Sequence, residues 1–505
     1  MAGRVLQTGA GRQSAQRLAV LLMAGALFSK VLGLVREVLV AHAIGASMIA
    51  DSFRGGFTAI FLPIGFLQSE TVPAILIPTY RAWYATGEAA RRFAGLSVAL
   101  TLLAALLFLG VEAAAPAWID ILLGGFSEAA RSMTLRFTRI MALAMPASVL
   151  LGCLSAAEIA QGRSRLTSAR ASVVNVAVIA GVSLLLTTGN AEALAWSFAA
   201  AFNGLAVWGL WLLLRDGSLD VSAMSVRSIW AGGAAFFVRL RPMALQPVAE
   251  YAAIWIERLL ASGLLIGSLA SLDYARTITD CAVLLVSQPI GLAVLSAGPS
   301  RDIRAQMDAL TRPALAFAIP GSIFLVLFAP ELVELVFRRG AFDGTAVMLT
   351  SQALRGIAAG MWAMTLGWIL LRILNSAGRN ARATMIMAAA FGANALTSAL
   401  LAPRLGELGL GLGEAVRGVV LLAGVAMALG GAGQLVRLLL LASPCAACLL
   451  AGECLVRAQV IGVLPRLLSG ATLAAAASVL LVYLLVPVGR ERIQLGLRAP
   501  LQRIR

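Results

Sequence analysis

Histidine, lysine and charged residues in general are scarce in this sequence of 505 residues. It contains one histidine, His42, and one lysine, Lys30. Only 13% of its residues are charged, against roughly a quarter in an average soluble protein. A single histidine excludes a metal site built from several histidines. The five cysteines lie in or beside apolar segments, and the Cys445-Ala-Ala-Cys448 spacing has no further cysteine pair or histidine to complete a metal site.

Apolar residues make up 60% of the chain, and the mean hydropathy is +0.90. Apolar runs of about 20 residues, the length that crosses the hydrocarbon core as a helix, recur along the sequence. The sequence therefore predicts an all-α integral membrane protein with about fourteen transmembrane helices. The expected helices cover residues 18–43, 48–79, 93–118, 134–160, 166–187, 192–214, 229–260, 264–298, 313–337, 345–374, 380–402, 408–430, 434–456 and 464–488.

The arginines indicate how the chain is oriented in its membrane. The net charge is +16, and the arginines lie mostly in short loops between apolar runs and at the two termini. This placement is typical of a topology signal and of contact with anionic headgroups, and it argues against nucleic-acid binding. Loops after even-numbered predicted helices are richer in arginine than loops after odd-numbered ones, so we expect both termini in the cytoplasm. The first apolar run is too long for a signal peptide and is expected to remain as a helix.

The sequence contains an internal repeat. Three charged residues recur 222 positions later (from 36 to 258): Arg36, Asp51 and Arg54 return as Arg258, Asp273 and Arg276. Six predicted helices separate the copies, so both copies have the same orientation and are related by an axis along the membrane normal. We expect an N-terminal six-helix lobe over residues 1–220, a second six-helix lobe over residues 221–432, and two further helices with a basic tail over residues 433–505.

Both copies of the repeat place charged side chains inside predicted transmembrane helices, where they are costly and usually face a cavity or a partner. If the two lobes face each other, these residues line a polar cavity with surplus positive charge, which suits an anionic ligand because arginine binds phosphate in bidentate fashion. In the alternative interpretation these charged residues only form ion pairs that hold helices together, or their side chains extend toward the headgroups. The predicted substrate-binding residues are Lys30, Arg36, Glu37, Asp51, Arg54, Arg258, Asp273 and Arg276.

Several segments resemble a known family. The stretch from Phe28 to Glu37, followed by Ile44-Gly45-Ala46 and Ala50-Asp51-Ser52-Phe53, resembles the opening of the lipid II flippase (MurJ/MviN) family, which reads S-R-x-x-G-x-x-R-[DE], then G-A and D-A-F. Tyr274-Ala275-Arg276 is similar to the family's Y-A-x-R with one residue missing. Residues 332–343 are similar to its F-x-x-G-x-F loop. The sequence is identified as a divergent member of this family, within the multidrug/oligosaccharidyl-lipid/polysaccharide exporter superfamily.

The resemblance implies a two-lobed transporter, not an enzyme, whose two extra C-terminal helices form a groove for a lipid tail. Its cargo would be an undecaprenyl-pyrophosphate-linked glycan such as lipid II. The cargo would be flipped by alternating access from the inner to the outer leaflet of the bacterial inner membrane. No cofactor is expected, and no Walker A pattern is present. The drive would come from the membrane potential or from a coupling cation, Na⁺ or H⁺, with Glu257 and Asn394 as the coupling-ion residues. The other expected partners are membrane lipids and proteins of cell-wall or polysaccharide synthesis.

The resemblance also has departures. Arg36, Glu37 and Asp51 match cavity positions of the family, whereas Lys30 stands where the family has arginine, and Ile64 stands where it has a second-helix arginine. A flippase for another lipid-linked polysaccharide unit therefore stays open beside lipid II. A cation-coupled drug antiporter of the same superfamily would need acidic residues to dominate the cavity. A membrane-embedded glycosyltransferase would need a catalytic site in large extracellular loops, and the loops here are short. A scaffold that transports nothing is the remaining alternative.

Overall fold

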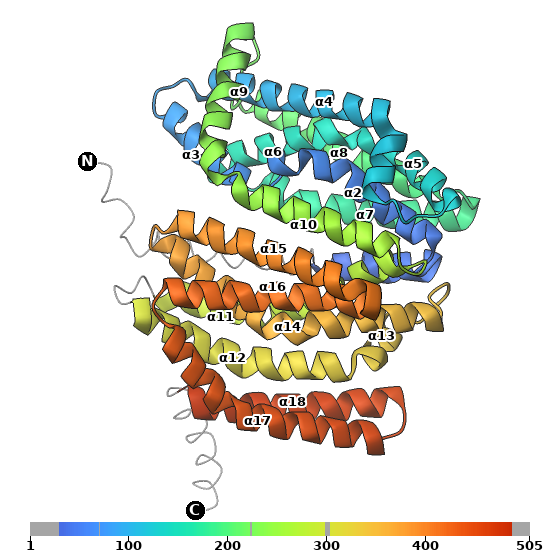
Figure 1. The fold of residues 1–505 in the computed structure, drawn as a ribbon. Coiled ribbons are helices and arrows are strands. Elements are labelled where there is room, and N and C mark those ends of the chain that lie inside the picture. The colour runs from blue at the N-terminus through green and yellow to red at the C-terminus, as the bar shows by residue number, and fades with distance from the viewer. Residues whose placement is uncertain (1–29, 70, 223–224, 298–302, 487–505) are drawn as a thin grey trace, which may run out of the picture. The chain divides into compact units, whose positions relative to one another are not determined.

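The computed structural model describes residues 30–69, 71–222, 225–297 and 303–486, and all their regular structure is helical (Figure 1). After a first helical stretch over residues 30–44, the elements are α2 (Met48–Ile64), η1 (Gly65–Leu67), α3 (Thr71–Tyr84), α4 (Ala89–Leu122), α5 (Glu128–Ala142), α6 (Ala144–Ala160), α7 (Arg165–Thr188), α8 (Glu192–Arg215), α9 (Val226–Leu240), η2 (Arg241–Met243), α10 (Leu245–Ser262), α11 (Ser268–Ala297), α12 (Ile303–Leu327), α13 (Ala329–Phe337), α14 (Gly344–Ser376), α15 (Asn380–Leu405), α16 (Glu407–Ala428), α17 (Ala432–Gln459) and α18 (Val463–Leu485).

The helices confirm the predicted class of membrane protein. Among the described residues, nine helices are long and apolar enough to cross a membrane, and two bent pairs raise the number to eleven if each pair is one span. The three remaining predicted spans correspond to residues 30–44, to α9 with α10, and to α11. Of these, α10 and α11 each carry three charged residues, which lowers their hydropathy although they are helical.

Four expected helices are broken rather than continuous, and the ninth of the fourteen divides into α12 and α13. The second expected helix divides into α2, η1 and α3, and the seventh divides into α9, η2 and α10. The fourth divides into α5 and α6, which meet at an angle of 42°. Pro146 lies in the first turn of α6, where a proline without an N–H fits best. The exact break points depend on such local chemistry more than on the length of the apolar run.

The chain forms two compact units, each assembled from several segments. Unit 1 comprises Met1–Ala43, Gly55–Ile119 and Arg131–Pro242, and unit 2 comprises Ile44–Arg54, Asp120–Ala130 and Met243–Arg505. Unit 2 therefore contains two short segments from the first half of the chain together with α10 to α18. The predicted division into three parts at residues 220 and 432 stays a prediction.

Helices α6, α7 and α8 pack together in unit 1, and α3 packs against α6. Aromatic rings join α2 to α8, because the Phe61 ring lies 6.0 Å from that of Phe198 and 6.0 Å from that of Phe202. Such tilted and edge-to-face ring pairs add about 0.5–1.5 kcal/mol each beyond the burial of their apolar surface. This core fixes the positions of α2, α7 and α8, which carry several of the polar side chains of unit 1.

A hydrogen-bonded network holds the loop between α6 and α7. The buried Glu158 carboxylate accepts from Arg165 at 2.6 Å and from the backbone N–H of Leu166 at 2.7 Å. Arg163 and Arg165 both donate to Asp216, just after α8, at 2.6 and 2.8 Å. The hydrogen bond from Arg165 lowers the pKa of Asp216 below its usual value. These loop arginines, which indicated topology in the sequence, therefore also join three helix ends.

Close helix contacts dominate unit 2. Helix α14 packs extensively against α16 and α12, and α17 and α18 form a hairpin that packs on α12 (Figure 1). Glycines allow α14 and α16 to approach, since a Cβ atom added at Gly360 would lie 2.2 Å from the Cα atom of Ala415. Small residues at crossing points are typical of helix packing in membranes, because they let the backbones come close.

The repeat found in the sequence has a structural counterpart at its glycines. Gly45 and Gly267, which occupy matching positions of the two copies, have φ angles of +60° and +95°. A Cβ atom at Gly45 would lie 2.3 Å from the carbonyl oxygen of Ala341, and one at Gly267 would lie 2.3 Å from that of Ala46. Only glycine adopts this backbone readily and fits this space. The shared turn before α2 and α11 supports the internal repeat.

Candidate functional site

Charged and polar side chains gather within unit 1 on the first helical stretch and α7. The Arg36 guanidinium pairs with the carboxylate of its neighbour Glu37 and donates to the side-chain oxygen of Asn175 on α7 at 2.9 Å. Glu37 is 2% exposed, whereas 27% of the Arg36 side chain is exposed. A buried carboxylate and an amide therefore orient a guanidinium that stays accessible. Lys30 lies at the start of the same stretch and is exposed.

Unit 1 has a further arginine with polar partners, Arg170 of α7, which was not among the site residues predicted from the sequence. Arg170 donates to the side-chain oxygen of Gln68 at 3.1 Å, and Gln68 in turn donates to Ser148 at 2.6 Å. The Arg170 guanidinium also lies 5.6 Å from the centre of the Phe202 ring. A charge near the start of an expected transmembrane helix was the signal that would have found it.

In unit 2, Asp51 caps a helix. Its two carboxylate oxygens accept from the backbone N–H groups of Gly267 at 2.6 Å and Ala270 at 2.8 Å, at the N-terminus of α11. A carboxylate here satisfies amides that have no partner within the helix and interacts favourably with the positive end of the helix dipole. This contact indicates a structural role for Asp51, and its predicted role toward the substrate stays a prediction.

Three arginines surround the carboxylate of Asp273 on α11. Arg258 of α10 approaches it at 2.6 Å, and Arg54 of α2 and Arg276 of α11 each approach it at 3.7 Å. Asp273 and Arg276 lie three residues apart on one helix, a spacing at which opposite charges can pair. The Arg54 guanidinium also lies 5.5 Å from the centre of the Tyr274 ring. The three guanidinium groups and the carboxylate of Asp273 are all largely buried.

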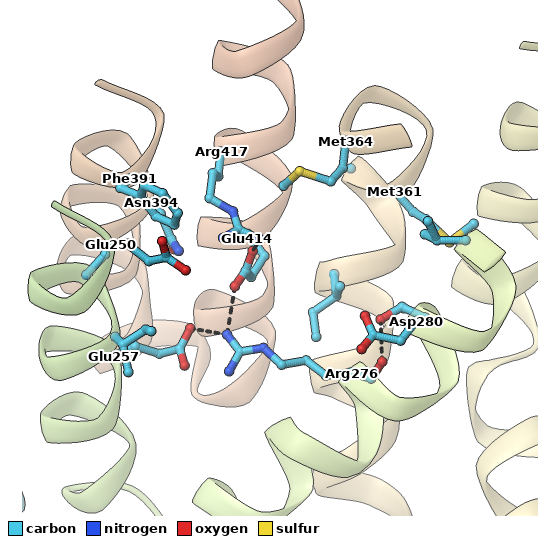
Figure 2. Close-up of a pocket in the computed structure, with 16 residues that line it drawn as sticks. Glu250, Glu257, Arg276, Asp280, Met361, Met364, Phe391, Asn394, Glu414 and Arg417 are labelled. Atoms are coloured by element: carbon cyan, nitrogen blue, oxygen red, sulfur yellow. Dashed lines mark hydrogen bonds and ion pairs between the residues drawn. The ribbon is translucent and has the colours of Figure 1, made fainter. Parts of the chain in front are cut away.

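The Arg276 guanidinium reaches further, into a pocket between α10, α11, α14, α15 and α16. Figure 2 shows it directed at two carboxylates: it pairs with Glu257 of α10 and lies 2.7 Å from Glu414 of α16. Glu414 also pairs with Arg417 at 2.5 Å. The cavity measures about 250 Å³ and is also lined by Asn394 of α15. Buried charges are tolerated in such a place because each has an opposite partner.

Glu257 has one oxygen to spare in this pocket. Its side chain is 3% exposed, and its Oε1 atom has no hydrogen-bond partner among the described residues. Asn394 is also buried and accepts from Ser398 at 3.2 Å. Both predicted coupling-ion residues thus line one polar pocket. Within the described part of the chain, no group of three or more His, Cys, Asp or Glu side chains is placed to hold a metal ion.

The structure therefore divides the predicted substrate-binding residues between the units. Lys30, Arg36 and Glu37 belong to unit 1, and Asp51, Arg54, Arg258, Asp273 and Arg276 belong to unit 2. The prediction that both sets line one chamber stays a prediction. Glu414 and Arg417 were not among the predicted site residues, although two opposite charges three apart on an apolar helix are a readable signal.

The residue at position 64, where this sequence departs from the pattern of the family, lies in the core. Ile64 is the last residue of α2 and is completely buried. An arginine there would have to be accommodated where this chain packs an apolar side chain. The arginine that the resemblance leads one to expect near this position is therefore absent, and an apolar side chain packs there.

A set of apolar helices with oppositely charged side chains paired inside them defines a polytopic α-helical membrane protein. The sequence model of the family described as "Lipid II flippase MurJ" matches residues 40–484. The chain belongs to the lipid II flippase MurJ family. Both the fold class and the family predicted from the sequence are confirmed.

Individual relatives agree with this assignment. A protein described as "Probable lipid II flippase MurJ" from Aquifex aeolicus (strain VF5) is 24% identical over 352 residues, which cover 66% of this chain and 67% of the relative. A solved structure described as "Lipid II flippase MurJ, inward closed conformation" has a TM-score of 0.77 at 15% identity and covers 92% of this chain and 99% of its own. An inward-facing multidrug resistance MATE transporter has a TM-score of 0.59 at 12% identity, with coverages of 80% and 96%. At these identities the two structures show a shared fold.

Proposed function

We propose that this chain is a flippase that carries lipid II from the inner to the outer leaflet of the bacterial inner membrane. The observation that carries this proposal is the family match over residues 40–484. Membership of this family makes the chain a transporter rather than an enzyme. Two arginine-containing clusters, around Arg36 and around Asp273, supply the chemistry that a pyrophosphate requires.

The ion pairs suggest how a pyrophosphate is bound and released. Asp273 is shared by three guanidinium groups, and one of them, Arg276, also pairs with Glu257 and Glu414. A pyrophosphate that entered this region would find guanidinium groups already oriented by a carboxylate and by helix packing. Exchange of these groups between Asp273 and the pyrophosphate would let the substrate bind without leaving a buried charge unpaired. We propose alternating access, in which the polar clusters open first to one side of the membrane and then to the other.

Glu257 is the group that we propose for cation coupling, with Asn394 beside it in the pocket. Its spare oxygen suits a proton or Na⁺, and uptake of that cation would weaken the Arg276 pair. Replacement by Gln (Glu257→Gln) is expected to leave a flipping rate that no longer responds to an imposed Na⁺ or H⁺ gradient, measured in vesicles with a defined gradient. An unchanged response to both gradients would contradict this role, and the membrane potential would then be the remaining drive.

The proposed orientation places both termini in the cytoplasm. In the order of the fourteen helices expected from the sequence, the arginine-rich loops follow the even-numbered ones. The lipid-linked glycan and membrane lipids are the proposed partners, together with proteins of cell-wall synthesis. A reporter enzyme that is active only in the cytoplasm, fused to the C-terminus, is expected to be active. An inactive reporter on a full-length, membrane-inserted chain would reverse the orientation.

A second candidate cargo is another polyprenyl-linked polysaccharide unit. The buried Ile64, at a position where the family resemblance leads one to expect arginine, is the observation that favours it. Drug antiport has weaker support, because the similarity to the multidrug transporter fold is lower than that to the flippase fold.

The function is tested in bacteria depleted of their own lipid II flippase. Production of this chain is expected to restore growth and to move lipid II to the outer leaflet, because family membership carries the transport activity. Cells that carry the empty vector are the negative control. If a membrane-inserted chain left lipid II on the inner leaflet but moved a polysaccharide precursor, the second cargo would replace the first.

A further inference from the structure

Two arginines of the α17–α18 hairpin converge on α13, against which α18 packs. Arg457 of α17 and Arg466 of α18 approach one oxygen of Glu331, on α13, at 3.8 and 3.4 Å. Arg355 of α14 lies close enough to Arg457 and Glu331 for their charges to act on it. These four residues, all in unit 2, form what we call the hairpin cluster.

The hairpin cluster has more positive than negative charge. Glu331 is 5% exposed, and the one oxygen that it uses is shared by Arg457 and Arg466. Within the described residues, Arg355 has no carboxylate within ion-pair distance. The neighbouring carboxylates do not correct the imbalance. Glu334 pairs with Arg338 at the end of α13, and neither oxygen of Glu453, one turn before Arg457, is hydrogen-bonded to a described residue.

The two hairpin arginines are held in place by backbone carbonyl groups. Arg457 donates to the carbonyl oxygen of Leu327 at 2.6 Å, at the end of α12, and Arg466 donates to that of Val460 at 2.6 Å. About a third of each side chain is exposed, 34% for Arg457 and 32% for Arg466. A guanidinium has five N–H donors, so each keeps donors for a further partner. The groups are therefore oriented before that partner binds.

The position of the hairpin cluster favours a lipid as the partner. Arg457 lies in the last turn of α17 and Arg466 in the first turn of α18, and both helices are long and apolar enough to span a membrane. The turn between two such helices lies near the boundary where lipid phosphates are found. Two apolar side chains of this turn region are exposed, Ile461 at 89% and Leu464 at 55%. Acyl chains would cover these side chains while a phosphate contacts the arginines.

We propose that the hairpin cluster binds the phosphate of a membrane lipid at the turn between α17 and α18. The ligand chemistry is a lipid-borne phosphate, either in a phospholipid headgroup or at the head of a polyprenyl carrier. The site shares no residue with the Arg36 cluster or with the pocket around Arg276. It does not rest on the proposed lipid II transport, and it would hold a lipid against the hairpin.

The test measures lipid retention by the full-length chain in detergent, by native mass spectrometry, with added phosphatidylglycerol, undecaprenyl phosphate or inorganic phosphate. The variant Arg457→Gln/Arg466→Gln is expected to lose affinity for the preferred lipid by about tenfold, equivalent to about 1.4 kcal/mol. The matched control Arg339→Gln/Arg404→Gln removes two exposed arginines of the same unit and is expected to bind as the unmodified chain does. Preference for either lipid supports the site and identifies the source of the phosphate.

Equal lipid retention by the unmodified chain and the hairpin variant would overturn the proposal. So would equal losses in both double variants, which would indicate general attraction between charges. Binding of inorganic phosphate with no lipid preference would also overturn it. If the hairpin variant does not fold, Arg466→Lys replaces it. That change keeps the charge but loses the fork of donors, and it is expected to weaken lipid binding while the unfolding temperature without lipid stays unchanged.

Discussion

Replacing Arg276 by methionine (Arg276→Met) is expected to abolish flipping and to destabilise the folded chain. Arg276 is the shared partner of Glu257 and Glu414, whose side chains are 3% and 9% exposed. Methionine fills similar space but leaves Glu257 without its guanidinium partner and Glu414 with only Arg417. Removing one member of a buried pair costs about 3–5 kcal/mol. Thermal unfolding in detergent and lipid II transfer in vesicles measure the two effects.

The double variant Glu257→Gln/Arg276→Met separates stability from transport. It removes one carboxylate together with the guanidinium, so we expect it to recover most of the lost stability and none of the transport. The control is Arg338→Met, which breaks an exposed pair with Glu334 and is expected to cost less than about 1 kcal/mol. A folded Arg276→Met variant that flips lipid II at the normal rate would remove Arg276 from the mechanism.

The second large effect is expected at Arg36 in unit 1. The conservative change Arg36→Lys keeps the positive charge, and with it the partner of the buried Glu37. It removes the planar fork that binds two phosphate oxygens at once. A hydrogen bond to a charged group contributes about 1.5–3 kcal/mol, so we expect transport to fall by about 10- to 100-fold while the chain stays folded. Initial rates at a series of lipid II concentrations measure the loss.

The matched control for Arg36→Lys is Arg92→Lys on α4. Arg92 also pairs with a carboxylate, that of Glu88, but both side chains are about half exposed. A lysine there keeps the pair and is expected to transport as the unmodified chain does. Identical rates for both lysine variants would mean that the fork geometry of Arg36 has no part in binding.

Much of the fold could be predicted because a membrane permits few structures. Backbone groups in lipid must be hydrogen-bonded within their own segment, so a long apolar run predicts a helix almost by itself. The expected helices that the structure shows as broken are those in which a few residues decide where a helix ends. Arg241–Met243 breaks the seventh expected helix, and the bend before α6 accompanies Pro146. Neither break changes the apolar pattern from which the helices were predicted.

The sequence could predict which residues belong to the site, but not which of them contact one another. The 222-residue offset identified Asp273 and Arg276 as residues that matter, and their contact follows from the geometry of one helix. Asp51 is different, since its partners are backbone amides more than 200 positions away. Such contacts depend on how α2 and α11 pack, which no local pattern records. The partners of Arg276 on α10 and α16 were hidden for the same reason.

Purified chain in vesicles, supplied with fluorescent lipid II on one side, tests the central proposal most directly. The measurement is the fraction of lipid II that a membrane-impermeant quencher can reach on the opposite side as time passes. We expect that fraction to rise with the amount of folded chain in the vesicles and to stay near the protein-free level with Arg276→Met. Folded, correctly inserted chain that moves no more lipid II than protein-free vesicles, with and without an ion gradient, would contradict the assignment.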